Sequence, residues 1–156
     1  MKTSLKTHQK GFTTLEIMIV VAIIALLAAL ALPAFKKARN RSQNTRFIAE
    51  LRVATDAFEQ FAMNAGGYPP EAGTAVVPSG MEEYLSRFNW AQPTSIGGNW
   101  DWDNAAIGVD EGVSIIGSIP DSRAAEIDSQ IDDGDLITGL FRKRSDGNGY
   151  IYITGS

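Results

Sequence analysis

The chain contains no cysteine, and its only histidine, His8, lies close to the N-terminus. Without cysteine there is no disulfide bond, no thiolate metal site and no cysteine nucleophile. Histidine is the commonest general base and a frequent zinc ligand. A protein that lost residues 1–11 would have no histidine for either role. These absences argue against an enzyme.

Basic residues are too few for a general nucleic-acid-binding surface. The formal charge is −4, and residues 1–11 hold Lys2, Lys6 and Lys10 but no acid, so their removal would take the charge to −7. Affinity for nucleic acid depends largely on Lys and Arg side chains that displace counterions. The composition therefore argues against nucleic acid as a partner.

What the chain does contain is a long apolar run near its N-terminus. Residues 17–32 read IMIVVAIIALLAALAL, and Phe12, Leu15 and Phe35 extend the stretch. As a helix, residues 12–35 would measure roughly 36 Å, which crosses a hydrocarbon core of about 30 Å with some tilt. No small-x-small cleavage site follows the run, unlike in a secretory signal peptide. We expect it to span a membrane and to stay in the mature protein.

Glu16 lies at the edge of this apolar run. An acid inside a membrane segment is costly and marks a functional group by default. Alternatively, Glu16 lies near the helix start, where it reaches the headgroups and complements the positive end of the helix dipole. Basic residues lie on both sides of the run, so charge alone does not set its orientation.

A helical pattern continues beyond Pro33, a residue that bends a helix or ends it. Apolar residues recur at steps of three and four at Phe47, Leu51, Ala54, Phe58, Phe61 and Ala65. Such a stripe predicts a helix that continues to about Asn64 and packs under a head domain. Gly66 and Gly67 would then end it.

Residues 66–156 are typical of a small head with loops and short strands. We predict a short helix over residues 81–88 and strands over residues 113–119, 136–142 and 150–154. The sequence SDGNG between the last two predicts a hairpin. A small antiparallel sheet packed on the long N-terminal helix gives an α+β fold.

Three tryptophans in the head, Trp90, Trp100 and Trp102, are candidate contacts for a ligand. The last two lie in the segment IGGNWDWD, where glycines open the chain. The alternative is that they anchor a loop onto a small core.

Four acids supply enough oxygen for a calcium ion: Asp128, Asp132, Asp133 and Asp135. Their spacing does not follow an EF-hand, which places its ligands at alternate positions around a glycine. The alternative is a solvated acidic loop without a metal. No other cofactor is expected.

The run KGFTTLE at residues 10–16, followed by the apolar stretch, resembles the prepilin signature of type IV pilins and type II secretion pseudopilins. The resemblance implies that prepilin peptidase cuts between Gly11 and Phe12 and that Phe12 is then N-methylated. Glu16 and Pro33 match the family's assembly acid and its helix-interrupting proline.

The same resemblance implies four segments. Residues 1–11 form a cleaved leader, 12–35 a transmembrane and polymerisation helix, 36–65 an amphipathic helix half, and 66–156 the head. It implies a single-pass inner-membrane protein, with the leader in the cytoplasm and the head in the periplasm or outside the cell, that enters a filament after assembly.

The expected role is that of a structural subunit of a type II secretion pseudopilus or a type IV pilus-like filament. Its expected partners are other pilin-like subunits, prepilin peptidase, an assembly platform protein with its ATPase machinery, and membrane lipid. The missing C-terminal cysteine pair favours a pseudopilin, whereas the missing calcium loop disfavours the major pseudopilin. The alternatives are a minor pilin whose head binds a ligand, surface or DNA at the filament tip, and a single-pass membrane enzyme or sensor.

Overall fold

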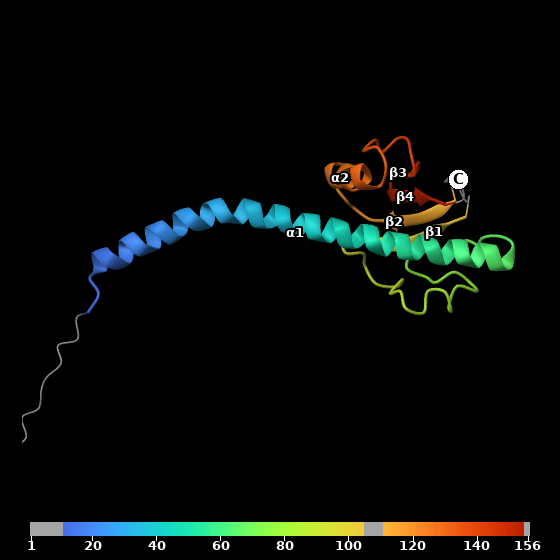
Figure 1. Cartoon of the computed structure of the whole chain (residues 1–156), viewed down its shortest axis with the longest axis horizontal. Coiled ribbons are helices and arrows are strands. Elements are labelled where there is room, and N and C mark those ends of the chain that lie inside the picture. The colour runs from blue at the N-terminus through green and yellow to red at the C-terminus, as the bar shows by residue number, and fades with distance from the viewer. Residues whose placement is uncertain (1–10, 105–110, 155–156) are drawn as a thin grey trace, which may run out of the picture. The chain divides into compact units, whose positions relative to one another are not determined.

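The computed structural model describes residues 11–104 and 111–154, so the expected leader lies outside the described residues except for Gly11. Its elements in chain order are α1 (Thr14–Ala65), β1 (Asn99–Asp103), β2 (Gly112–Ile116), α2 (Asp121–Ile131), β3 (Phe141–Lys143) and β4 (Gly149–Ile153) (Figure 1). This confirms the predicted α+β fold with a long N-terminal helix and a small antiparallel sheet. The chain divides into two units, Met1–Arg39 and Asn40–Ser156.

The first helix is continuous in sequence from Thr14 to Ala65 and includes Pro33. It ends one residue beyond the predicted position. Gly66 has a φ of +78°, and its N–H donates to the carbonyl of Ala62 at 2.9 Å. A left-handed residue directly after the last turn is the usual way in which glycine stops a helix.

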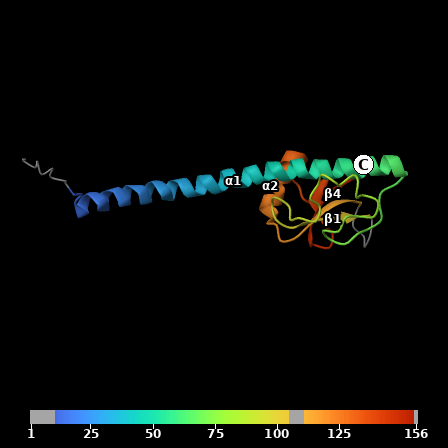
Figure 2. The ribbon, with the colours of Figure 1, turned by 90° about the horizontal axis from the view of Figure 1, so that it is seen from below.

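The four strands form one antiparallel sheet in the order β1-β2-β4-β3. The predicted hairpin joins β3 to β4, with Phe141 opposite Tyr152 and Lys143 opposite Tyr150. Figures 1 and 2 show the strands gathered along the second half of α1.

The core of the second unit lies between α1 and the aromatic side chains of the head. The rings of Phe58 and Trp102 stack at 4.1 Å between centroids, and those of Phe47 and Trp100 stack at 5.7 Å. The predicted apolar stripe is confirmed for its buried members, Phe47, Leu51, Ala54 and Phe58. Burial of a Leu or Phe side chain contributes about 1.5–3 kcal/mol, so this seam stabilises the packing of the head on α1.

Two elements were not predicted. β1 has the sequence NWDWD, in which apolar and acidic residues alternate as on a strand with one face on the core. In α2, Ala124, Ile127 and Ile131 follow helical spacing and pack in or against the core. Acids and glycines around both segments suggested loops instead.

Two predicted elements are corrected. Residues 81–88 form successive hydrogen-bonded turns rather than a helix, with the N–H of Leu85 donating to Met81 and that of Phe88 donating to Leu85. The strand predicted over 136–142 shrinks to β3. Residues before it form a loop in which the N–H of Thr138 donates to Asp135, because local turns satisfy those backbone groups instead of a neighbouring strand.

The acids of β1 surround a buried arginine. One guanidinium nitrogen of Arg144 contacts Asp103 and lies 3.7 Å from a carboxylate oxygen of Asp101, and the other lies 3.0 Å from Asp146. The hydroxyl of Ser114 donates to Asp103. Oδ1 of Asp101 is buried without a hydrogen bond to any part of the chain that the structure describes.

Asp101 should make the stability of the head depend on pH. Burial raises the pKa of Asp101 to about 6, with a further contribution from Asp103, while Arg144 opposes the rise. Because the folded state holds this proton more tightly than the unfolded state, the Asp101 contribution to stability falls as pH rises from about 4 to about 6. We expect the free energy of unfolding of Asp101→Asn, relative to wild type, to rise by up to about 3 kcal/mol between pH 4 and pH 7.

Urea unfolding of the full chain in detergent, followed by tryptophan fluorescence, measures this difference. Asp121→Asn is the control. Hydrogen bonds from Tyr150 and Lys143 lower the pKa of Asp121, so its titration lies outside that pH range. Parallel pH profiles for Asp101→Asn and wild type would contradict the assignment.

Candidate functional site at the start of the first helix

The start of α1 is capped by three reciprocal hydrogen bonds between Thr13 and Glu16. The N–H and the hydroxyl of Thr13 donate to Oε2 of Glu16 at 2.7 Å and 2.8 Å, and the N–H of Glu16 donates back to the Thr13 hydroxyl at 3.2 Å. This is a capping box, which satisfies N–H groups that the first helical turn leaves free. Thr13 was not among the predicted site residues, although the spacing Thr-x-x-Glu is the sequence signal for this motif.

The bond between Gly11 and Phe12 lies just before this cap and is open to solvent. Phe12 is 84 % exposed, and a Cβ placed on Gly11 would meet no atom within 4 Å. Nothing in the described residues of the chain requires glycine at position 11. A requirement for glycine there would have to come from a molecule that approaches the bond.

The apolar half of α1 is uncovered along its length. An 18-residue stretch of this helix has a mean hydropathy of 2.9 and no buried residue, and by length and composition it is able to cross a membrane. Its large side chains are more than half exposed between Phe12 and Phe35. Such a surface needs lipid or other apolar helices around it.

Pro33 lies inside α1, and the helix continues to Ala65. Simple termination of the helix at this proline is therefore excluded. Proline has no N–H to donate to the carbonyl four residues earlier, so it leaves that carbonyl, on Ala29, without its usual helical partner.

The three tryptophans are core residues, so their interpretation as ligand contacts is wrong, and the alternative, that they anchor a loop onto the core, is confirmed. Trp90, Trp100 and Trp102 are at most 2 % exposed. The indole N–H of Trp90 donates to the carbonyl of Val76 at 2.8 Å, and that of Trp102 donates to Pro69 at 3.0 Å. Their polar ends are thus used to fix the loop that follows α1.

The structure brings together three of the four predicted acids. Asp128, Asp132 and Asp133 each offer a carboxylate oxygen, and these oxygens lie within 4.8 Å of one another. Asp135 is not part of this group. Its Oδ1 accepts the N–H of Ile137 at 3.0 Å.

Comparison with known proteins connects the start of α1 to a family. Residues 6–32 match a family model described as the prokaryotic N-terminal methylation motif. The chain is 45 % identical over 67 residues to fimbrial protein Q of Moraxella bovis and 38 % identical over 81 residues to type IV major pilin protein PilE1 of Neisseria gonorrhoeae. Over these residues the chain is similar to type IV pilins.

These matches cover part of the pilin-like chain. They include 43 % and 50 % of it, and 41 % and 49 % of the two relatives, so the chain spans about half the length of the curated relatives it matches. The methylation motif includes Gly11, Phe12, Thr13 and Glu16 and ends one residue before Pro33. No solved structure matches the pilin-like chain.

Proposed function

We propose that this pilin-like chain is a structural subunit of a type IV pilus-like filament, made as a membrane-anchored precursor and cut between Gly11 and Phe12. The observation that carries the proposal is the position of Glu16. Its carboxylate lies just after an exposed Gly-Phe bond and at the head of an apolar helix that no described residue covers. The names of the relatives, fimbrial protein and type IV major pilin, support the same role.

Cleavage would prepare the acid for assembly. It creates an amine at Phe12, which prepilin peptidase would then methylate. Both hydrogen bonds from Thr13 reach Oε2 of Glu16, and Oε1 makes no hydrogen bond to the described residues. Glu16 can therefore keep its helix cap and still accept the Phe12 amine of a neighbouring subunit.

Pairing of this amine with Glu16 would also set the stagger between subunits. Each charge is costly among apolar side chains, and the two neutralise one another only where they meet. An acid and an amine on otherwise apolar helices thus favour one axial register. Lipid would surround the helix until other subunits replace it, and the small residues Ala22, Ala25 and Ala28 allow close helix approach.

We favour a pilus-like filament over a type II secretion pseudopilus. The missing cysteine pair suggested a pseudopilin, but the relatives at 37–51 % identity are named as pilins or fimbrial proteins. The alternative of a tip subunit relied on the three tryptophans as contacts for a ligand. All three are buried, so this alternative has no candidate contacts left. The assembly platform, its ATPase and prepilin peptidase are partners in this proposal, with the leader in the cytoplasm and the head outside the inner membrane.

Gly11→Val should block processing. We expect the full precursor to accumulate in the membrane fraction, because the subunit itself tolerates a side chain at this position and only the peptidase would reject it. Mass spectrometry of the purified chain measures whether residues 1–11 are present and whether Phe12 carries a methyl group. Gly67→Val is the matched control, since a Cβ there also meets no atom within 4 Å. Normal cleavage of Gly11→Val would argue against this scissile bond.

A further inference from the structure

Asp128 is a buried acid without a hydrogen-bond partner in the described part of the chain. Its side chain lies on α2 and is 0 % exposed. Neither carboxylate oxygen accepts a hydrogen bond from the residues that the structure describes. Buried carboxylates in folded proteins are almost always paired, hydrogen-bonded or bound to a metal, because an isolated buried charge is strongly unfavourable.

The groups around Asp128 increase this cost. Burial raises the pKa of Asp128, and the carboxylates of Asp133, Asp132 and Asp135 raise it further. The nearby N–H of Gly134 opposes the rise, but it does not have the geometry of a hydrogen bond to either oxygen. The charged groups that act on Asp128 are thus all acids. The cluster also lies at the C-terminal end of α2, which has no basic residue in its last turn. A helix C-terminus carries partial negative charge and favours a cation.

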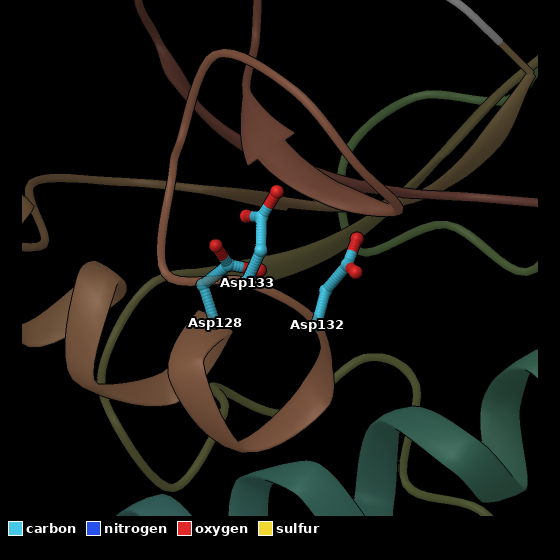
Figure 3. A group of neighbouring side chains, drawn as sticks. All are labelled: Asp128, Asp132 and Asp133. Atoms are coloured by element: carbon cyan, nitrogen blue, oxygen red, sulfur yellow. The ribbon is translucent and has the colours of Figure 1, made fainter.

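The spacing of the three acids fits a calcium ion. Figure 3 shows Asp128 on the last turns of α2, with Asp132 and Asp133 directly after it. One oxygen from each lies within 4.8 Å of the other two. Calcium binds oxygen at about 2.3–2.6 Å, so two of its ligands are at most about 4.6–5.2 Å apart. Magnesium, with bonds of about 2.0–2.1 Å, demands near-ideal octahedral geometry and gives up its water reluctantly, so it is rarely held by protein ligands alone.

The loop after α2 holds two of these acids in place. Oδ2 of Asp132 accepts the N–H of Leu140 at 2.6 Å, and Oδ1 of Asp133 accepts the N–H of Asp135 at 2.8 Å. Gly139 leaves room for Asp132, because a Cβ there would lie 2.0 Å from Oδ2. The oxygens are therefore brought together by the backbone before any ion binds.

We propose that Asp128, Asp132 and Asp133 bind one calcium ion in the head. The ion supplies the missing partner of Asp128 and links the end of α2 to the loop before β3. Backbone carbonyls or water complete its coordination, since calcium takes six to eight oxygens. All three ligands are hard oxygens, which select calcium or magnesium over zinc or copper. This inference does not depend on the proposed role in a filament.

The test is calcium binding by the full chain in detergent, after treatment with EDTA. Isothermal titration should give one calcium per chain, with a dissociation constant of about 10⁻⁴–10⁻³ M or tighter, the range of the weaker natural calcium sites. In 5 mM calcium the melting temperature should rise by about 5 °C or more relative to EDTA. Magnesium at the same concentration should give a smaller rise.

Three variants make the test specific. Asp128→Asn and Asp133→Asn should each weaken calcium binding at least tenfold, and Asp133 is exposed, so its variant remains informative if Asp128→Asn does not fold. Asp128→Asn should also be at least as stable as wild type in EDTA but less stable in calcium. Asp135→Asn is the matched control and should bind calcium like wild type.

Absence of calcium binding by the wild-type chain up to 5 mM would overturn the proposal. Wild-type affinity in both Asp128→Asn and Asp133→Asn would overturn it equally. A response to magnesium equal to that to calcium would overturn the choice of ion.

Discussion

Glu16→Gln should yield a precursor that is cut and methylated normally but enters filaments at least ten times less well than wild type. Glutamine also serves at the third position of a capping box, so its amide oxygen can still accept the N–H of Thr13. The start of the helix is thereby kept and only the charge is lost. The Phe12 amine of the neighbouring subunit would then be left without a counter-charge among apolar helices, at a cost of about 3–5 kcal/mol. Mass spectrometry checks processing, and the amount of the chain in sheared surface filaments measures assembly.

Thr13→Val does the reverse of Glu16→Gln, because it weakens the helix cap and keeps the charge of Glu16. It removes both hydrogen bonds of the Thr13 hydroxyl but leaves the Glu16 carboxylate. Loss of such a cap costs about 1 kcal/mol at the helix start, so assembly should fall only slightly below that of the matched control Thr14→Val. If Thr13→Val abolished assembly while Glu16→Gln assembled normally, the role of Glu16 would be to cap the helix and not to pair with an amine.

The N-terminal helix could be predicted from the sequence because each of its features is local. Three signals predict it: an unbroken apolar run, helical spacing after Pro33 and a glycine after Ala65. Each of these signals involves only residues that are close together in the sequence. The same holds for the hairpin between β3 and β4, whose turn sequence is strong. The cap at Thr13 was predictable on the same grounds.

The remaining features depend on contacts between distant residues. β1 is a strand because Trp100 and Trp102 pack on α1, while Asp101 and Asp103 face Arg144, about forty residues later in the chain. Its composition alone suggested a loop. The sequence also left open whether the three tryptophans contact a ligand or anchor a loop on the core, since burial depends on packing partners that spacing does not reveal.

The acidic residues of the head also differ in ways that their sequence does not reveal. Asp128, Asp132, Asp133 and Asp135 are alike in sequence, but they differ in burial and in hydrogen bonds. Only the fold separates Asp128, which is buried and unpaired, from Asp135, whose carboxylate holds a turn. Only three of the four acids come together as candidate calcium ligands. Their spacing in the sequence could not show which three these are.

Arg144→Met should lower the free energy of unfolding of the head by about 3–5 kcal/mol at pH 7, which is the typical cost of removing one partner of a buried ion pair. Methionine fills much of the same space, but it leaves Asp103 and Asp101 buried beside one another without a cation. Since typical domains are stable by about 5–15 kcal/mol, this loss would unfold a substantial part of the population near 37 °C. Urea unfolding of the full chain in detergent, followed by tryptophan fluorescence, measures it.

The neighbouring Lys143→Met is a matched control, because it removes the same charge from the surface. Lys143 pairs with Asp121 at 2.9 Å, and their side chains are 44 % and 62 % exposed, so the loss should not exceed about 1 kcal/mol. Adding Asp101→Asn to Arg144→Met should recover part of the lost stability, since one of the two unpaired acids is then neutral. Equal effects of the two single variants would mean that the acids of β1 reach solvent and do not depend on Arg144.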